Sequence, residues 1–404
     1  GDPQPALMDL LQQIRLLTEQ LFPEVVGHYR HLHSHPELSY REQETAAYIA
    51  AFLQKEGISY RSGIGGYGIV VEVKGEKELS ENCIAFVADM DALPVQEEND
   101  VPYRSLNEGV MHACGHDAQS AALMGAVKML HSLRGHFAGT LLFVFQPGEE
   151  QSPGGANLML RDNLFGEQTP RMIVKQHAYI DLPAGQVAFQ SGTVMASADE
   201  VHLTVKGQGG HGALPHELND TVLAASQIVV AMQQLASRRS NPFHPIVLSF
   251  GRFIAAGATN VIPPEVTLAG SLRCMNEEER RKMLGLIPQI ASDTAAAYGC
   301  RCEAVLPEGY PCVISDETIT REVKVAAAEW LGAERVGEYP RRMTADDFGF
   351  FTQQYPCCYY RFGVSTTNKR SGALHSGSFL IDEEALRTAT GLPAAIALKC
   401  LKME

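Results

Sequence analysis

The chain has 404 residues, more than one ordinary hydrophobic core accommodates, so we expect two domains. Its apolar share of 45% and charged share of 20% are typical of a globular protein, and no apolar run is long enough to span a bilayer. The net charge of −14 argues against nucleic acids and anionic membranes as partners, because both attract basic surfaces.

The nine cysteines are scattered without the regular spacing of a disulfide framework. The pair Cys300 and Cys302 and the adjacent Cys357 and Cys358 read as strand residues. Reduced cysteines are typical of the cytoplasm, which is where we expect the protein. Because the sequence begins with Gly1 rather than Met, export after removal of a signal peptide stays an alternative.

The first half of the chain alternates between helical and strand patterns. Helices are predicted over residues 6–31, 41–57 and 117–133, and strands over 69–73, 84–88, 141–145 and 172–175. This alternation predicts an α/β domain with a mixed sheet flanked by helices. Ligands of such sheets gather at the carboxyl ends of strands. Asp89 and Asp91, then Glu149 and Glu150, then His177 each follow a predicted strand, so we expect them at one site.

The middle of the chain has a different character. Strands are predicted over residues 201–206, 246–253 and 266–273, and helices over 221–237 and 276–297. These elements form an α+β module of about a hundred residues. Alternation of strands and helices resumes after Pro307. We therefore expect a catalytic domain of residues 1–196 and 308–404, interrupted by an inserted domain of residues 197–307.

Two short segments carry groups that bind transition metals. Met111-His112-Ala113-Cys114-Gly115-His116-Asp117 places a thiol and an imidazole two residues apart, and Gln146-Pro147-Gly148-Glu149-Glu150 follows a strand with paired carboxylates. A lone Cys is usually a small buried hydrophobe and a Glu pair is usually solvated, but their joint occurrence favours a metal-dependent hydrolase. The candidate ligands are Cys114, His116, Glu150, His177 and His375.

Five ligands are too many for one tetrahedral ion with an open position, and they suit two ions that share a bridging ligand and a water. Cys114 is the natural bridge, because a thiolate lies next to a metal-binding His. Glu149, adjacent to a ligand but free itself, is the expected general base. We expect two divalent ions per subunit, zinc or manganese first, with cobalt and nickel also accepted by such donors.

The segments His112–Asp117, Gln146–Glu150 and Ala88-Asp89-Met90-Asp91-Ala92-Leu93-Pro94 resemble the two-metal amidohydrolase branch of the aminoacylase/carboxypeptidase metallopeptidases. That branch includes hippurate hydrolases, N-acyl-amino-acid amidohydrolases and auxin-conjugate hydrolases. The resemblance extends from Arg30 to about Ala385. It implies a catalytic domain with an inserted lid and dimerisation domain, the five ligands above, Glu149 as catalytic base, and Asp91 as the acid that orients a metal-site group.

The resemblance also assigns residues of the inserted domain. Lys206-Gly207-Gln208-Gly209-Gly210-His211-Gly212-Ala213 resembles the family stretch whose His reaches the active site of a dimer partner, where His211 would stabilise the oxyanion. Segments around Asn260 and Arg273 resemble those that grip the substrate carboxylate, for which the planar fork of Arg273 is suited. A homodimer through the inserted domain is implied.

The sequence departs from the family pattern at three places. Lys175 and Gln176 precede His177, where relatives usually carry an apolar residue immediately before the His, and Gln119 stands where relatives often have His. Ala345 precedes an acidic pair that the family usually opens with Ser or Gly. None of these positions removes a proposed ligand, but each could shift substrate preference.

Two motifs are set aside. Gly63-Ile64-Gly65-Gly66-Tyr67-Gly68 satisfies the dinucleotide fingerprint, but a β-branched run follows it instead of a helix. The histidines His28, His31, His33 and His35 lie at the end of the first helix, and Pro36 disfavours helical geometry at His35, so a structural role is expected.

The predicted activity is metal-dependent hydrolysis of the amide bond of N-acyl amino acids, such as N-acetyl or N-benzoyl conjugates. One alternative is a metallo-dipeptidase or carboxypeptidase with the same two-metal chemistry, acting on dipeptides. The other is a catalytically silent relative that binds small conjugates. The complete set of ligands together with Glu149 argues against the silent relative, which would be free to lose one of them.

Overall fold

The computed structural model describes residues 3–402, with side chains from residue 6 onward, so both chain ends of the predicted catalytic domain lie outside the described residues. The chain divides into two compact units. The first unit comprises Gly1–Gly192, Ile314–Pro340 and Phe350–Glu404, and the second comprises Thr193–Val313 and Arg341–Gly349. The predicted insertion of residues 197–307 falls inside the second unit. Residues 341–349, which the sequence assigned to the catalytic domain, group with the second unit instead.

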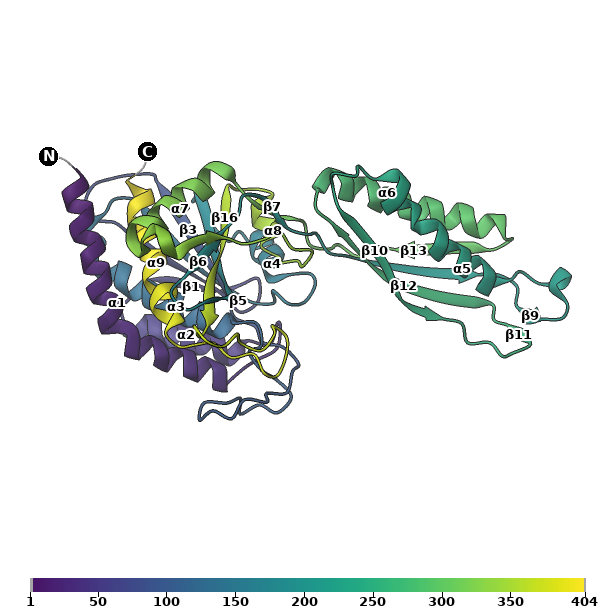
Figure 1. Ribbon diagram of the computed structural model, residues 1–404, viewed down its shortest axis with the longest axis horizontal. Coiled ribbons are helices and arrows are strands. Elements are labelled where there is room, and N and C mark those ends of the chain that lie inside the picture. The colour runs from purple at the N-terminus through teal and green to yellow at the C-terminus, as the bar shows by residue number, and fades with distance from the viewer. Residues whose placement is uncertain (1–2, 403–404) are drawn as a thin grey trace. The chain divides into compact units, whose positions relative to one another are not determined.

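The first unit is built around an eight-stranded mixed sheet with the order β1-β2-β4-β3-β5-β16-β6-β15 (Figure 1). The central strands β4, β3, β5 and β16 are parallel to one another, whereas β2 and β6, on either side of them, are antiparallel to β4 and β16. They are almost wholly buried, as expected for apolar runs covered on both faces. The strands are β1 Tyr60–Ile64, β2 Gly68–Lys74, β3 Cys83–Asp89, β4 Thr140–Gln146, β5 Met172–Pro183, β6 Val187–Phe189, β15 Val336–Glu338 and β16 Cys357–Ser365.

The predicted α/β class is confirmed, and one strand differs from its prediction in a way that matters for the site. The sequence places the end of the strand at Lys175, whereas β5 continues to Pro183. His177 therefore lies inside β5, in register with Arg361 of β16, rather than just past a strand end. The Gly63–Gly68 segment forms the turn of the β1–β2 hairpin, so the structural context of a dinucleotide site is missing there.

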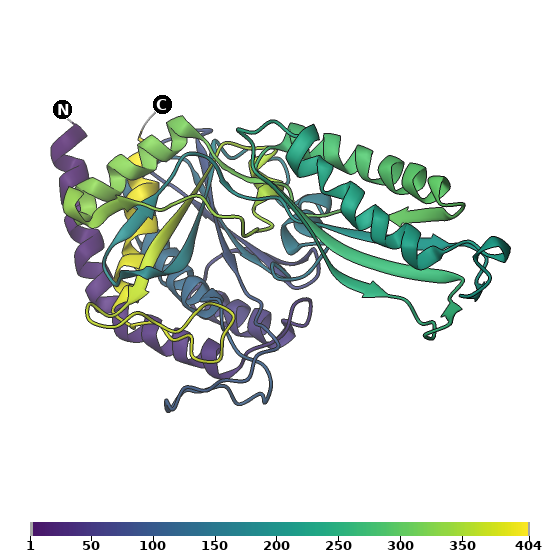
Figure 2. The ribbon, with the colours of Figure 1, turned by 45° about the vertical axis from the view of Figure 1, so that its right-hand side comes forward.

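Helices of the first unit pack against one face of the sheet and form a hydrophobic core with it. Side chains of α1, α2, α3, α7 and α9 pack with alternate residues of the strands, among them Phe86, Phe143, Val174 and Tyr360. In Figure 2 the long helix α1 lies beside α9. The helices are α1 Pro3–Ser34, α2 Gln43–Lys55, α3 His116–Ser132, α4 Gly155–Arg161, α7 Glu317–Leu331 and α9 Ala385–Leu401, with short turns η1 Arg134–His136 and η4 Ala333–Arg335.

The other face of the sheet carries polar residues. Because side chains alternate along a strand, Asp89, Lys175, His177 and Arg361 lie on the face opposite the helical core. All four are buried in a chain whose polar residues are otherwise mostly exposed. The fold thus concentrates ionisable groups on one face, next to the carboxyl ends of the parallel strands.

The second unit is an antiparallel four-stranded sheet with the order β10-β12-β8-β13, and α5 and α6 cover one side of it (Figure 1). It has its own apolar core. Its elements are β8 Asp199–Lys206, β9 Gly210–His211, η2 Pro215–Glu217, α5 Thr221–Met232, a π-helical turn η3 Leu235–Arg239, β10 Ile246–Ile254, β11 Val261–Ile262, β12 Glu265–Cys274, α6 Glu277–Ala297, β13 Arg301–Val305 and α8 Gly349–Thr352, which begins at the end of this unit. β7 Gly192–Met195 pairs with β14 Val313–Ser315.

Within residues 3–402, none of the helices combines the length and the apolar composition that crossing a membrane requires.

Candidate metal centre

The candidate ligands come from segments next to the sheet of the first unit and, for His177, from within β5. Asp89 ends β3, Glu149 and Glu150 follow β4, and the segment before α3 carries Cys114. Gly115 adopts a left-handed backbone with φ +82°, and a Cβ there would lie 2.7 Å from the Cβ of Ala178. The glycine therefore lets the Cys114–His116 segment approach β5 closely.

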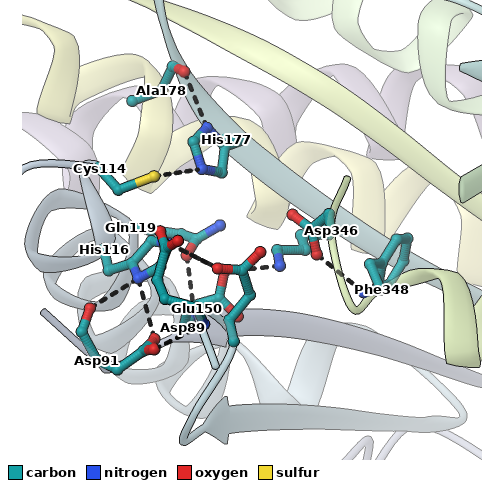
Figure 3. A network of polar contacts seen from close by, with 12 residues as sticks. Asp89, Asp91, Cys114, His116, Gln119, Glu150, His177, Ala178, Asp346 and Phe348 are labelled. Atoms are coloured by element: carbon teal, nitrogen blue, oxygen red, sulfur yellow. Dashed lines mark hydrogen bonds and ion pairs between the residues drawn. The ribbon is translucent and has the colours of Figure 1, made fainter. Parts of the chain in front are cut away.

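Cys114 belongs to two groups of candidate ligands, and Figure 3 shows its side chain next to that of His177. Its Sγ is 3.5 Å from Nε2 of His177, and donor atoms of Cys114, His116 and His177 all lie within 4.8 Å of one another. A second group of the same kind joins Cys114 with Glu150 and His375, whose Nε2 is 3.4 Å from Oε1 of Glu150. One thiol shared by two groups is the geometry that a bridging ligand needs.

Hydrogen bonds fix which ring nitrogen of each histidine faces the cluster. Nδ1 of His116 donates to the backbone carbonyl oxygen of Asp91 at 2.8 Å and to its Oδ1 at 3.1 Å, which leaves Nε2 directed inward. The other carboxylate oxygen of Asp91 accepts from the Ser39 hydroxyl at 2.7 Å and from the Glu150 amide at 2.9 Å. His177 donates through Nδ1 to the carbonyl oxygen of Ala178 at 3.0 Å, so its Nε2 faces Cys114. Carboxylates and carbonyls commonly orient metal-binding imidazoles in this way.

The electrostatics of the cluster favour positive charge inside it. Although burial lowers the pKa of His116, the carboxylates of Asp89 and Asp91 raise this pKa to about 10. Burial raises the pKa of the Cys114 thiol well above its usual range, and Glu150 and Glu149 raise it further. Divalent cations would supply the positive charge directly and hold the thiol as thiolate.

Two of the candidate ligand atoms have no hydrogen-bond partner in the described part of the chain, as expected of atoms that bind a metal ion. Nε2 of His116 and Oε1 of Glu150 are buried and have no hydrogen-bond partner among the described residues. Buried polar atoms without partners are costly and rare in native proteins. Sulfur, imidazole and carboxylate donors at these positions suit zinc, manganese, cobalt or nickel.

Glu149 is buried at 6% exposure, and its Oε2 lies 3.9 Å from Nε2 of His116. It stands beside the ligands without belonging to either Cys114 group. This is the position expected of a base that acts on a group held by the ligands.

Asp89 is a further acidic donor that the sequence did not assign. It forms a group with His116 and Glu149, and its Oδ2 lies 3.5 Å from Nε2 of His116. The same oxygen is 2.6 Å from Nζ of Lys175, and both side chains are fully buried. Because this ion pair already neutralises Asp89, the carboxylate is better placed to orient and balance charge than to replace Glu150 as a ligand.

His375 occupies a backbone conformation that side chains rarely adopt. Its φ is +65°, and its amide donates to the carbonyl oxygen of Ala113 at 2.7 Å. A non-glycine residue in the left-handed region stores strain that the surroundings must offset. The hydrogen bond ties the residue to the Cys114 segment, which brings its imidazole to Glu150.

The three candidates of the predicted insertion all lie in the second unit. His211 in β9 and Asn260 are exposed and close together, since the Gly212 amide donates to the carbonyl oxygen of Asn260 at 2.7 Å. Arg273 is half-buried near the end of β12. The residues from Glu265 to Arg273 span about 26 Å at the rise of an antiparallel strand. One carboxylate therefore cannot contact Asn260 and Arg273 of the same chain.

The state of the His211 ring follows from a backbone contact. The Ala213 amide donates to Nδ1 of His211 at 3.1 Å, so Nδ1 is the acceptor nitrogen. In the neutral ring the proton then resides on Nε2, which is left as a hydrogen-bond donor.

Two of the departures from the family pattern, Gln119 and Gln176, belong to one buried network. The Gln119 side chain accepts from the Asp89 amide at 2.8 Å and donates to the carbonyl oxygen of Gln176. The Gln176 side chain in turn bonds the Tyr360 hydroxyl at 2.9 Å. Gln119 therefore joins β3 to β5 beneath the site. These contacts explain the polar residues before His177 as structural partners.

The histidines at the end of α1 make structural contacts, as expected. His33 is buried, and its Nδ1 lies 2.7 Å from Oδ2 of Asp117 and its Nε2 lies 2.6 Å from Oε2 of Glu97. Burial lowers its pKa, but these two carboxylates raise it to about 9. Among the described residues, none of the metal-binding groups includes His28, His31, His33 or His35.

Glu42 is a buried residue near the site that the sequence did not single out. It accepts from the Gly148 amide at 2.7 Å and thereby anchors the turn that presents Glu149 and Glu150. Burial raises the pKa of Glu42 to about 8. A solitary Glu at the start of a helix gives no sequence signal of this contact, which joins residues 106 positions apart.

Known proteins are similar to this chain in sequence and in fold. The model of Peptidase family M20/M25/M40 matches residues 85–399. The N-acyl-L-amino acid amidohydrolase of Geobacillus stearothermophilus is 35% identical over 304 residues, covering 75% of this chain and 81% of that protein. Thermostable carboxypeptidase 2 of Saccharolobus solfataricus is 32% identical over 398 residues, covering 97% and 99%. The crystal structure of the YXEP protein of Bacillus subtilis, a dinuclear metal-binding peptidase, matches with a TM-score of 0.82 at 30% identity, covering 96% and 100%.

Proposed function

Because the chain belongs to peptidase family M20/M25/M40 and is a metal-dependent hydrolase, we propose that it cleaves the amide bond between an acyl group and an amino acid, releasing a free amino acid and a carboxylic acid. The observation that carries this proposal is a thiol shared by two ligand groups beside the buried Glu149. A dipeptidase or carboxypeptidase with the same chemistry is the alternative, which the similarity to thermostable carboxypeptidase 2 supports.

We propose two divalent ions, zinc or manganese, at this cluster. Cys114 would bridge them, with His116 and His177 on one side and Glu150 and His375 on the other. Bound ions would polarise the substrate carbonyl and lower the pKa of the attacking water.

Glu149 would take the proton of the attacking water and then deliver it to the leaving amine. Asp91 would hold His116 in its orientation throughout, because it accepts from Nδ1. His211 would donate from Nε2 to the carbonyl oxygen as it becomes negatively charged, a role supported by the Ala213 contact that occupies Nδ1. Arg273 and Asn260 would bind the carboxylate of the amino acid. The length of β12 between Glu265 and Arg273 favours a contribution of Arg273 from one chain, and of Asn260 together with His211 from a partner chain.

A homodimer through the second unit is part of this proposal. β10 is an edge strand of its sheet and exposes Val247, Phe253 and Ile254, while α5 exposes Leu223 and Val230. Exposed apolar side chains on an edge strand and on a helix face are ones that proteins usually cover. A second copy of the same surface would cover it with closed symmetry.

A cytoplasmic location is likewise proposed. All nine cysteines are unpaired, and eight of them are buried. Unpaired thiols in this number are typical of a reducing compartment. Cell fractionation followed by immunodetection would test it.

The function is tested by turnover of N-acetyl, N-benzoyl and dipeptide substrates with the metal content measured on the same samples. We expect the purified protein to release amino acids from the N-acyl substrates, and Glu149→Gln to keep its metal and lose nearly all turnover. Glu167→Gln, on an exposed carboxylate, is the matched control. Full turnover by Glu149→Gln would reject the base assignment, and turnover of dipeptides alone would favour the peptidase alternative. Ligand binding without metal or turnover would favour the silent relative.

A further inference from the structure

The side chain of Arg361 is a buried cation that the proposed mechanism does not use. Arg361 is 2% exposed, and its Nε and Nη2 are buried with no hydrogen-bond partner in the described part of the chain. It forms no salt bridge with any described residue. Isolated buried charges are expensive, so they are normally paired or used for binding.

Aromatic rings frame the guanidinium. Its Cζ lies 4.9 Å from the ring centre of Tyr339, 5.3 Å from that of Tyr359 and 5.5 Å from that of Tyr179. Cation–π attraction offsets part of the desolvation cost, but it leaves the N–H groups without acceptors. The rings hold the charge in place with its donors free.

The two nitrogens without partners form one edge of the guanidinium, and the same edge binds a carboxylate with two hydrogen bonds at two other arginines of this chain. Arg30 pairs with Glu383 through Nε and Nη2, both at 2.8 Å. Arg280 pairs with Asp199 through the same two nitrogens at 2.7 Å and 2.9 Å. Two parallel N–H donors match the two oxygens of a carboxylate. At Arg361 this carboxylate is missing.

The position of Arg361 relates this edge to the metal centre. Arg361 in β16 is the register partner of His177 in β5, so the two side chains lie on the same face of the sheet. The ring of Tyr359 stacks on that of His177 at 6.2 Å and also lies against Arg361. A substrate held at the His177 side of the cluster would therefore present its neighbouring groups to Arg361.

We infer that Arg361 is a specificity residue for a second carboxylate on the acyl group of the substrate. This inference rests on the proposed function, in which Asn260 and Arg273 already bind the carboxylate of the amino acid. The preferred substrate class is then an N-acyl amino acid whose acyl part is a dicarboxylic acid joined through one of its carboxyl groups. The carboxylate would accept hydrogen bonds from Nε and Nη2 at once.

A matched pair of substrates tests the inference. N-succinyl-L-methionine and N-butanoyl-L-methionine have acyl chains of equal length, and only the first carries the second carboxylate. We expect the wild type to prefer the succinyl substrate through its KM. In Arg361→Met this preference should fall by about 10- to 100-fold, as expected for loss of a charged hydrogen-bonded pair, while turnover of the butanoyl substrate is kept. Arg361→Lys keeps the charge without the fork and should fall between the two.

Several outcomes would overturn the inference. One is a preference for the succinyl over the butanoyl substrate that is unchanged in Arg361→Met, and another is an equal loss of turnover on both substrates. The third is turnover of the butanoyl substrate that depends on chloride or acetate, which would identify a free anion as the occupant. Thermal unfolding should show Arg361→Met at least as stable as the wild type, because an unpaired buried charge is removed. If that variant fails to fold, Arg361→Lys carries the test.

Calorimetry separates this inference from the proposed function. Succinate and butanoate are titrated into the metal-loaded wild type and into Arg361→Met. If the wild type binds succinate more tightly than butanoate and Arg361→Met loses this difference, the subsite is supported even if neither substrate is turned over. If both substrates are turned over but the two acids bind equally, the proposed function stands and the subsite is rejected.

Discussion

The carboxylate of Asp91 orients the imidazole of His116 and at the same time binds the backbone amide of Glu150. One side chain thus fixes the ring of one candidate ligand and the main chain of another, at 3.1 Å and 2.9 Å. The two ligands belong to different proposed ion sites, so Asp91 couples the geometry of both.

Asp91→Asn should weaken metal binding without unfolding the protein. The amide keeps the size of the carboxylate, but it loses the charge that accepts from the imidazole, and such orienting partners are worth about 10- to 100-fold in metal affinity. Competition with a chelator of known affinity measures the effect. Asp293→Asn, on the exposed side of α6, is the control and should bind metal as the wild type does. Equal affinities in the two variants would show that Asp91 has no orienting role.

Lys175→Met should destabilise the protein strongly. Nζ of Lys175 lies 2.6 Å from Asp89, and both side chains are fully buried, so the substitution leaves a buried carboxylate without its cation. Breaking such a pair from one side costs about 3–5 kcal/mol in free energy of unfolding. Denaturant unfolding measures the loss. Lys175→Met with Asp89→Asn removes both charges and should recover part of the stability, whereas additive losses would mean that the pair is not coupled.

Glu42→Gln should stabilise the protein increasingly as the pH rises. Burial raises the pKa of Glu42 from 4.5 to about 8, so the folded state favours the protonated carboxyl group. That contribution to stability is fully present below pH 4.5 and is lost as the pH rises through about 8. Glutamine stays neutral and can still accept from the Gly148 amide. Unfolding free energies of the two proteins should coincide near pH 4, diverge between pH 4.5 and about 8, and differ by a constant amount above that range. A difference that does not change between pH 4 and pH 8 would contradict the assignment.

Mixed dimers should recover activity if His211 acts across the dimer. His211→Ala and Glu149→Gln are each expected to be nearly inactive, for lack of the oxyanion donor and of the base respectively. After the two proteins are dissociated and reassociated together, half of the dimers combine one chain of each kind, and each such dimer has one complete site. Activity should then return to about a quarter of the wild-type value. No recovery despite confirmed subunit exchange would assign His211 to the site of its own chain.

Local sequence signals were sufficient for the central strands and most of the candidate site. Apolar runs identified β2, β3 and β4, and the spacing of Cys114 and His116 identified them as candidate ligands, because both signals depend on neighbouring residues. The short strand β13 was indicated only by Cys300 and Cys302, which read as strand residues, because Arg301–Val305 is half-exposed and forms no apolar run that would give its bounds.

Long-range pairings could not be predicted from the sequence. The Lys175–Asp89 ion pair, the Glu42–Gly148 hydrogen bond and the isolated Arg361 all depend on strand register or on loops far apart in the chain. The residues next to a charged residue in a strand do not indicate whether an oppositely charged side chain will lie beside it in the fold. The grouping of residues 341–349 with the second unit is likewise set by tertiary contacts.

The candidate ligands lie on both sides of the second unit in the chain order. Cys114, His116, Glu150 and His177 precede it, and His375 follows its last segment. Bound ions would therefore act as a crosslink that closes a loop of the chain around the whole insertion, and closing so long a loop restricts the unfolded chain considerably. A protease cut in the exposed segment around His211 should then leave two fragments associated while the ions are present. Chelation would weaken the association of the two fragments, so the metal would stabilise the structure as well as take part in catalysis.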